Sequence, residues 1–245
     1  MPSSTELEQL LPSAHRRHLA SLLSTAALLG PHEDRSRFAR ALARRVDALR
    51  AGGLTPDERR LVIEALQAEI LPRRAACTTL ATQPEGADAL RLAWRAERVQ
   101  DLVQRVEGWL SLLQDTLLPP AYGDAEAQVE YLTWTGDLKL MLHEHAPEGG
   151  HEVSAARSYE QAVELALNHL EPTHPLRLGV LLNDALCIYE HLKDQKKAAQ
   201  LLQRALDMAV AQLDHLEGLS YEQTTAILKV MMDRLAAWKA EGAGA

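Results

Sequence analysis

Apolar residues recur at spacings of three and four positions along most of the chain, which is the pattern of amphipathic α-helices. Proline and glycine residues interrupt this pattern and mark the connections between helices. No segment shows the strict alternation of apolar and polar residues that is typical of a half-buried strand. The predicted helices span about residues 13–29, 33–51, 55–82, 85–118, 124–146, 151–170, 175–193, 195–217 and 220–241. The chain is therefore predicted to be all-α, with nine antiparallel helices and a flexible N-terminal segment at residues 1–12.

Prolines define several helix boundaries. Pro172 and Pro175 cannot both lie inside one helix, because proline lacks an N–H and its ring clashes with the preceding turn. One helix therefore ends before Pro172 and the next begins at Pro175, with Thr173 as a candidate cap. Thr55 is a similar cap for the third helix. Pro72 falls inside that third helix, where we expect a kink or a break.

The helix that begins at Pro175 has two apolar stripes when it is wound at 3.6 residues per turn. The first stripe is a plain core stripe made of Leu178, Leu181, Ala185, Ile188 and Leu192. The second stripe is made of Gly179, Leu182, Asn183, Leu186 and Glu190. A glycine inside a helix is less favourable than alanine by roughly 1 kcal/mol, so we expect another group to approach the backbone closely at Gly179. Asn183 and Glu190 are either ligand-binding groups or polar groups at the edge of the core.

Composition narrows the class of protein. The chain has 245 residues, of which 47% are hydrophobic and 4% aromatic, enough to bury a sizeable helical core. The formal net charge of −8 argues against nucleic acid as the main partner. Cys77 and Cys187 are too few for a disulfide framework, which fits a reducing compartment. We find no signal peptide and no apolar run of the roughly 20 residues that span a bilayer. We therefore expect a cytoplasmic protein, with the nucleus as a second location, and no membrane partner.

Histidine and glutamate gather near residue 150 without the spacing of a metal site. His143 and His145 are two positions apart, so they lie on opposite sides of a helix, and glycines separate them from His151 and Glu152. The sequence also lacks a glycine-rich phosphate loop, a nucleophile elbow and a paired-carboxylate motif. We therefore predict no metal, no cofactor and no enzymatic activity.

The stretch from Pro172 to Asn183, PTHPLRLGVLLN, resembles the PTHPIRLGLALN signature of the 14-3-3 proteins, which are dimeric adaptors that bind phosphoserine and phosphothreonine peptides. Further matches to that family are Tyr131-Leu132 with Gly136-Asp137 (YL-x-x-x-GD), residues 209–214 (AIAELD), Ser220-Tyr221 and Trp238. The resemblance covers about residues 55–240. It implies a single domain over residues 13–241, with nine helices in a 14-3-3 arrangement that is related to tetratricopeptide repeats and has an amphipathic groove.

The resemblance also implies a dimer. In 14-3-3 proteins the first helices pair with the fourth helix across a two-fold axis, so the divergent helix pair at residues 13–53 is the expected dimer region. The second helix bears a row of arginines: Arg35, Arg37, Arg40, Arg44, Arg45 and Arg50. The fourth helix bears Trp94, Glu97 and Asp101. These opposite charges favour a homodimer, or a heterodimer with another 14-3-3 chain, over a nucleic-acid surface.

The phosphate pocket of the family is mostly substituted in this chain. The family holds phosphate with two arginines, a lysine and a tyrosine, through charge-assisted hydrogen bonds. Its helix-three arginine pair corresponds to Arg73 and Arg74, and Arg74 is the one expected in the pocket. The remaining pocket positions are Gln67 for the lysine, Leu140 for the second arginine and Met141 for the tyrosine. One of the two peptide-holding asparagines is kept as Asn183, and the other is replaced by Arg234.

These substitutions remove a large share of the free energy expected for phosphate binding. A hydrogen bond to a charged group contributes about 1.5–3 kcal/mol, so three lost partners remove roughly 4–9 kcal/mol. A whole micromolar complex has a binding free energy of about 8 kcal/mol. We therefore expect weak phosphate binding or none. An alternative is a relocated anion site made of Arg74, Lys139 and Arg234, unless Arg234 stacks on Trp238 or pairs with Glu190.

The groove is expected to be better preserved than the pocket. Its predicted lining is Gly179, Leu182, Asn183, Leu186, Glu190, Ile227, Val230, Arg234 and Trp238. The leading hypothesis is an adaptor that binds peptide segments of client proteins with weak or no dependence on phosphorylation. One alternative is a conventional phosphopeptide adaptor that uses the relocated cations. Another is a tetratricopeptide-type scaffold, because Ala155, Tyr159, Ala162 and Leu165 resemble one helix of such a repeat, although no recurrence with a period of about 34 residues is present.

Overall fold

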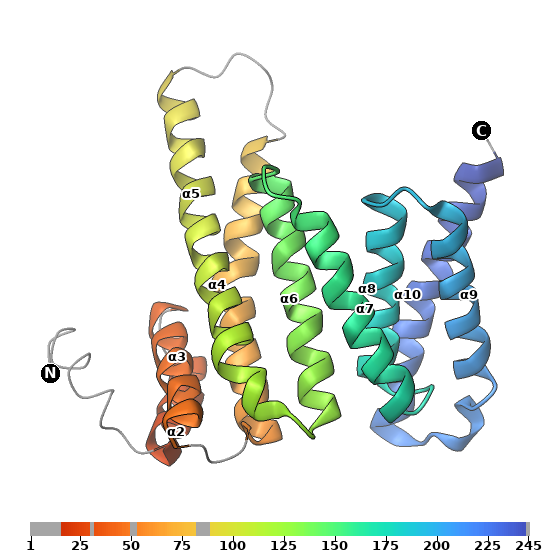
Figure 1. Cartoon of the computed structure of the whole chain (residues 1–245), viewed down its shortest axis with the longest axis horizontal. Coiled ribbons are helices and arrows are strands. Elements are labelled where there is room, and N and C mark those ends of the chain that lie inside the picture. Colours follow the sequence, from red (N-terminus) through yellow and green to blue (C-terminus); the bar gives the residue numbers. More distant parts are fainter. Residues whose placement is uncertain (1–15, 30–31, 50–52, 82–88, 244–245) are drawn as a thin grey trace, which may run out of the picture. The chain divides into compact units, whose positions relative to one another are not determined.

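The structure is a computed structural model of the chain, and it describes residues 16–29, 32–49, 53–81 and 89–243. Within these ranges it contains nine α-helices and no β-strand, so the predicted all-α fold class is confirmed (Figure 1). The chain divides into two compact units, one up to Tyr122 and the other from Gly123 onward. The predicted flexible segment at residues 1–12 lies outside the described residues.

The first unit consists of α2 (Arg16–Leu29), α3 (His32–Leu49), α4 (Pro56–Ala81) and α5 (Ala89–Ser111), followed by a π-helical turn, η2 (Leu112–Leu117), and a 3₁₀ turn, η3 (Pro119–Ala121). Its fully buried large side chains are Leu19, Leu23, Leu42, Leu66, Ile70, Leu102, Trp109, Leu113 and Leu117. The α-helical part of α5 ends earlier than the predicted residue 118. The reason is a shift to π-helical hydrogen bonding, shown by the bond from the N–H of Leu118 to the carbonyl of Leu113 at 2.8 Å.

Helix α4 begins with a capping box. The N–H of Glu58 donates to Oγ1 of Thr55 at 3.4 Å, and the N–H of Thr55 donates to Oε2 of Glu58 at 2.9 Å, so the predicted Thr55 cap is confirmed. The expected break at Pro72 is not found, because α4 is continuous from Pro56 to Ala81. Pro72 lies on the exposed side of the helix.

The second unit consists of α6 (Ala125–His145), α7 (His151–His169), α8 (Pro175–Glu190), α9 (Gln195–Val210), the 3₁₀ turn η4 (Leu213–His215) and α10 (Gly218–Ala243). Successive helices alternate in direction, as Figure 1 shows. Helix α8 packs against α6, α7, α9 and α10. It therefore lies at the centre of the unit, and its different faces meet different neighbours.

The core stripe of α8 is confirmed for four of its five residues. Leu178, Leu181, Ala185 and Ile188 are buried in a cluster completed by α9 and α10. Leu192 is 41% exposed, because α8 ends at Glu190 and Leu192 belongs to the connection that follows. The predicted cap of α8 is also wrong. Nδ1 of His174 accepts the N–H of Leu176 at 3.2 Å, while Thr173 is buried and its carbonyl accepts the hydroxyl of Thr224 at 2.8 Å.

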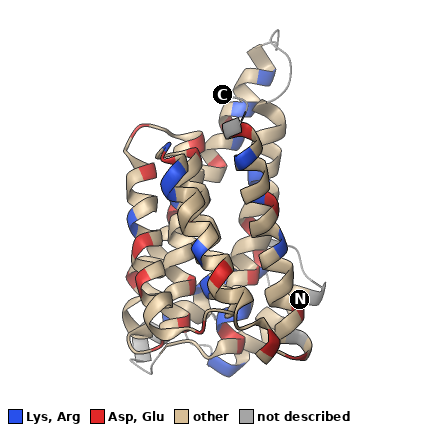
Figure 2. Cartoon of the chain, turned by 90° about the vertical axis from the view of Figure 1, so that its right-hand side faces the viewer, with Lys and Arg blue, Asp and Glu red and all other residues tan. Residues whose placement is uncertain are grey.

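Charged residues are mixed along the helices. Figure 2, which views the chain from the side of α9 and α10, shows Lys and Arg interspersed with Asp and Glu. Neither sign forms a continuous stripe in this view.

Candidate functional site

One carboxylate joins three helices of the second unit. Oδ1 of Asp137, on α6, accepts the hydroxyl of Tyr159 on α7 at 2.6 Å and the side-chain amide of Asn183 on α8 at 3.0 Å. Burial and the neighbouring Asp137 raise the pKa of Tyr159 well above its usual value, so its hydroxyl remains a donor. We name Asp137, Tyr159 and Asn183 the α6–α8 polar cluster. It holds the Asn183 amide in one orientation.

Gly136 explains why the cluster can form. A Cβ placed on Gly136 would lie 2.5 Å from Cε1 of Tyr159, far inside van der Waals contact. The glycine therefore admits the tyrosine ring, and the next residue, Asp137, receives its hydroxyl. Tyr159 and Asp137 were not predicted as site residues, although the Gly136-Asp137 pair was recognised as a family motif. The Gly136-Asp137 motif is visible in the sequence, but its contact with Tyr159 follows only from the packing of α6 on α7.

The second stripe of α8 lies at the edge of the core. Gly179, Leu182, Asn183 and Leu186 are half-buried, and Glu190 is exposed. Leu182 and Leu186 pack against the buried core cluster of α8, α9 and α10. The expected close approach at Gly179 is wrong, because no heavy atom lies within 4 Å of a Cβ built there. The stripe is an accessible surface with one polar group, Asn183, near its middle.

Helix α10 brings the other predicted groove residues to the same unit. Ile227 packs against the core cluster, whereas Val230 is 47% exposed. Trp238 is buried, and its ring stacks on that of Tyr189 with centroids 4.3 Å apart. Most of the Trp238 surface is therefore occupied by the protein itself. Arg234 is exposed, and within the described residues it forms neither the expected stacking on Trp238 nor an ion pair with Glu190.

The two α6 residues at the predicted phosphate-pocket positions are apolar, and the neighbouring Lys139 is already hydrogen-bonded. Leu140 is half-buried, and Met141 is 4% exposed. Nζ of Lys139 donates to Oγ of Ser158 at 2.9 Å and to the carbonyl of Ser154 at 3.2 Å, both on α7. Burial lowers the pKa of the Lys139 ammonium. Two of the three N–H groups of Lys139 are therefore engaged within the unit.

The remaining predicted cations lie on α4 of the first unit. Nε of Arg73 donates to Oδ2 of Asp101 at 3.0 Å, and its Nη1 donates to the carbonyl of Glu69 at 2.7 Å. These contacts tie the guanidinium to α5 and to the preceding turn of α4. Arg74 and Gln67 are half-buried on the same helix.

Comparison with known proteins decides the family. The model of the family described as 14-3-3 protein matches residues 31–239. The chain belongs to the 14-3-3 family. It is 32% identical over 196 residues to 14-3-3-like protein 1 of Caenorhabditis elegans, covering 77% of this chain and 79% of the relative. It is 34% identical over 200 residues to 14-3-3-like protein GF14-D of Oryza sativa subsp. japonica, covering 77% and 75%.

A plant relative aligns over most of the chain. This 14-3-3 protein is 31% identical over 241 residues to 14-3-3-like protein GF14 nu of Arabidopsis thaliana, covering 94% of this chain and 89% of the relative. The assignment confirms the resemblance found in the sequence. It also decides against the alternative of a tetratricopeptide-type scaffold.

The charges expected to form the dimer interface of this 14-3-3 protein are largely used within the first unit. Asp101 pairs with Arg73 at 3.0 Å and with Arg105 at 3.4 Å, and Glu97 pairs with Arg98. Among the arginines of α3, Arg40 lies over the ring of Trp109 at 4.7 Å. Arg50 lies outside the described residues. Several of these charges thus have partners within the first unit, and Trp94 is 50% exposed on α5.

Histidines of the second unit form pairs and not a metal centre. Nδ1 of His143 lies 3.1 Å from Oε2 of Glu152, and the ring of His143 meets that of His191 edge-on at 5.5 Å. In the described part of the chain no group of three or more His, Cys, Asp or Glu side chains is arranged to hold a metal ion. No helix among the described residues combines the length and the apolar character needed to cross a membrane.

Proposed function

We propose that this 14-3-3 protein is a non-enzymatic adaptor that binds peptide segments of client proteins with little or no dependence on phosphate. The observation that supports this proposal most directly is the chemistry of α6. Leu140 and Met141 stand where the family has an arginine and a tyrosine, and neither side chain can donate a hydrogen bond to phosphate. The nearby Lys139 is bonded to α7.

The peptide-binding surface in this proposal is the second stripe of α8 together with the exposed part of α10. Leu182, Leu186 and Val230 supply apolar area, and Asn183 supplies a fixed amide for the peptide backbone. Helices α8 and α10 pack directly against each other, which supports a surface that the two helices share. The affinity would come from apolar contact and backbone hydrogen bonds, which need no modification of the client.

A matched peptide array tests the phosphate dependence. Serine peptides and their phosphoserine twins are immobilised, and the hits are titrated by fluorescence anisotropy. We expect the two forms of each peptide to bind with dissociation constants within about tenfold of each other, a difference below 1.4 kcal/mol. A consistent preference for the phosphorylated twin beyond that range would reject the proposal in favour of a conventional phosphopeptide adaptor.

A variant that restores the family residues is the control for this test. The double substitution Leu140→Arg and Met141→Tyr returns to α6 the arginine and the tyrosine that the family has at these positions. We expect it to gain affinity for phosphopeptides only, because each restored donor contributes about 1.5–3 kcal/mol to binding a charged group. Met141 is buried, so circular dichroism must show that this variant keeps its helices.

Arg234 gives the conventional phosphopeptide alternative its one supporting feature, because it is an exposed cation without an ion-pair partner in the described structure. If phosphopeptides bind preferentially, Arg234→Ala should remove that preference. The same variant should leave the binding of unphosphorylated peptides within about threefold, since a surface charge contributes little to an uncharged ligand.

We also propose that the protein is a cytoplasmic dimer, with the helix pair at residues 13–53 in the interface. The proposal rests on family membership and on the exposed Trp94 of α5. Sedimentation velocity at two protein concentrations tests it. A single monomeric species at the higher concentration would reject the dimer, and Trp94→Ala should weaken the association if this face is used.

A further inference from the structure

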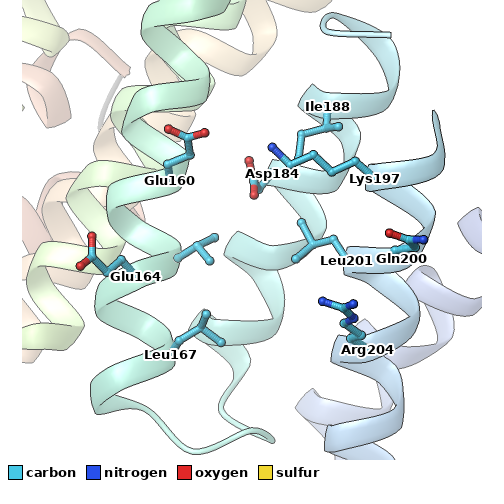
Figure 3. A pocket seen from close by; sticks show the side chains of 10 residues that line it. Glu160, Glu164, Leu167, Asp184, Ile188, Lys197, Gln200, Leu201 and Arg204 are labelled. Atoms are coloured by element: carbon cyan, nitrogen blue, oxygen red, sulfur yellow. The ribbon is translucent and has the colours of Figure 1, made fainter. Parts of the chain in front are cut away.

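A cavity lies between α7, α8 and α9, on a different side of α8 from the second stripe. Its volume is about 410 Å³, within the size range of small-molecule sites. Its apolar wall includes Val163, Leu167, Ile188 and Leu201. Figure 3 shows that charged side chains from all three helices surround this wall.

The cavity contains a buried carboxylate that lacks a partner. Asp184 is 5% exposed, and its Oδ1 atom is buried without any hydrogen-bond partner. Its carboxylate points into the cavity from α8, as Figure 3 shows. Buried polar groups in native proteins are nearly always hydrogen-bonded, so a buried carboxylate oxygen that faces a cavity is suited to accept a hydrogen bond from a ligand there.

Two cationic side chains at the cavity do not form an ion pair with the Asp184 carboxylate. Lys197 and Arg204 are both exposed on α9, and the described structure contains no ion pair between either of them and Asp184. Glu160 and Glu164 of α7 add two more carboxylates to the lining. The carboxylate of Glu164 points away from the cavity in Figure 3, whereas Glu160 lies near enough to raise the pKa of Asp184. The buried charge at the cavity is therefore the carboxylate of Asp184, because Lys197 and Arg204 are exposed, and this favours a positively charged ligand over an anion.

We propose that this cavity binds an ammonium group attached to a short apolar stem. The ammonium donates hydrogen bonds to Asp184 and lies near Glu160, and the stem packs against Val163, Leu167 and Leu201. Lys197 competes for the same carboxylate and swings into solvent when the ligand enters. Such a group occurs on free alkyl or arylalkyl amines and also on lysine side chains, whose methylene stem is apolar.

The protonation behaviour of Asp184 agrees with a ligand-dependent site. Burial raises the pKa of Asp184 to about 6; Lys197 opposes this shift and Glu160 adds to it. The other titratable groups near Asp184 are Arg204, which lines the same cavity, and Tyr159 and Cys187, whose own pKa values are raised. Because only the ionised carboxylate attracts an ammonium, the affinity should fall about tenfold between pH 7.5 and pH 5, where roughly nine-tenths of Asp184 is protonated.

Calorimetric titration of the full chain with 2-phenylethylamine tests the proposal, with 2-phenylethanol as the uncharged twin. We expect saturable binding of the amine, at least about tenfold weaker binding of the alcohol, and weaker amine binding at pH 5. Equal affinities for the amine and the alcohol, or an affinity that does not change with pH, would overturn the proposal.

A parallel titration with Nα-acetyl-lysine methylamide separates the two sources of the ammonium. If it binds at least as tightly as the free amine, the site takes a lysine side chain of a client; weaker binding assigns it to small amines.

Three variants distinguish this site from general attraction to an acidic protein. Asp184→Asn should abolish amine binding. Lys197→Ala should tighten it, because the competing ammonium is removed. Asp207→Asn, which removes an exposed carboxylate of α9 outside the cavity lining and changes the net charge by the same amount as Asp184→Asn, should leave it unchanged. Retained binding in Asp184→Asn or weaker binding in Lys197→Ala would overturn the proposal. If Asp184→Asn does not fold, Lys197→Ala and the pH series still decide.

Discussion

The side-chain amide of Asn183 donates a hydrogen bond to Asp137 at 3.0 Å, across the contact between α8 and α6. The same carboxylate oxygen accepts the hydroxyl of the buried Tyr159 at 2.6 Å. This bond uses one of the two N–H groups of the Asn183 amide and leaves its Oδ1 atom available to a peptide on the second stripe. In the proposed mode of binding, this oxygen accepts a backbone N–H of the client.

Replacing Asp137 with alanine should weaken both the fold and the binding of clients. The substitution leaves the hydroxyl of Tyr159 buried without an acceptor, which costs about 1–3 kcal/mol of unfolding free energy. It also frees the Asn183 amide to rotate. Urea denaturation measures the first effect, and anisotropy with an array-selected peptide measures the second.

Tyr159→Phe is the control for that substitution. It removes the hydroxyl together with its need for an acceptor, so it should destabilise the protein by about 1 kcal/mol and leave peptide affinity unchanged. In the double variant with both substitutions, Asp137→Ala should cost less unfolding free energy than it does alone. A double variant in which the two effects simply add would show that the α6–α8 polar cluster is not coupled.

Alanine substitutions at two glycines should have opposite effects on stability. Gly136→Ala places a Cβ 2.5 Å from the ring of Tyr159, and overpacking of this kind typically destabilises by about 1–3 kcal/mol. Gly179→Ala meets no heavy atom within 4 Å and improves helix propensity, so it should stabilise α8 by up to about 1 kcal/mol. Thermal denaturation of both variants would contradict this account if the two midpoints moved in the same direction.

These two glycines also show what the sequence can and cannot reveal. Local signals predicted the nine helices, because helix starts at Thr55 and Pro175 depend on nearby residues. The role of a mid-helix glycine depends on which side chain of another helix faces it, and periodicity does not contain that information. The sequence therefore suggested a close approach at Gly179, whereas the structure has it at Gly136.

The candidate site likewise has features that the sequence predicted and contacts that only the structure shows. The family resemblance located Asn183 and the substituted positions Gln67, Leu140 and Met141. It did not indicate that Lys139 is bonded to α7 or that Trp238 stacks on Tyr189. Those contacts join residues distant in sequence, so they depend on tertiary packing.

Asp184 should make the protein less stable at neutral pH than at acidic pH. Its pKa is raised from 3.8 to about 6, so the folded state binds this proton more tightly than the unfolded state. The stabilisation is complete below pH 3.8 and is lost as the pH rises through 6. Its full size is about 3 kcal/mol, from 1.36 kcal/mol per pKa unit.

Asp184→Asn should therefore raise the unfolding free energy at pH 8 by up to about 3 kcal/mol, and the gain should shrink toward pH 4.5. Urea titrations of both proteins at a series of pH values measure the difference. A difference that is constant with pH would show that Asp184 is not titrating in this range.

Glu69 should show the opposite dependence on pH. Its carboxylate accepts Nε1 of Trp109 at 2.7 Å, Nη1 of Arg105 at 3.2 Å and Nη2 of Arg40 at 3.3 Å. Burial alone would raise the pKa of Glu69, but hydrogen bonds from Ser36 and Trp109 and the charge and hydrogen bond of Arg40 lower it below its usual 4.5. The stabilisation is present above pH 4.5 and is lost as the pH falls below it.

Glu69→Gln keeps the shape of the side chain and removes its charge. We expect it to destabilise the first unit by about 1.5–3 kcal/mol at pH 7, where the hydrogen bonds to the carboxylate are charge-assisted. As the pH falls below 4.5, the difference in stability between the variant and the original protein should shrink. Urea denaturation followed by circular dichroism measures the difference in stability at each pH. Destabilisation of equal size at pH 4 and pH 7 would assign the effect to packing instead of charge.

Neither cysteine should react with thiol reagents in the folded protein. Cys77 and Cys187 are both free and buried. Burial raises the pKa of Cys187 to about 12, and the carboxylates of Asp184, Glu160 and Glu190 add to the shift. Burial likewise raises the pKa of Cys77, although the neighbouring Arg98 opposes this shift. Because the thiolate is the reactive form, an aromatic disulfide reagent at pH 8 should label neither residue until denaturant is added, when both should react. Rapid labelling of Cys187 without denaturant would show that α8 opens locally, and in that case the Asp184 cavity would not be a preformed site.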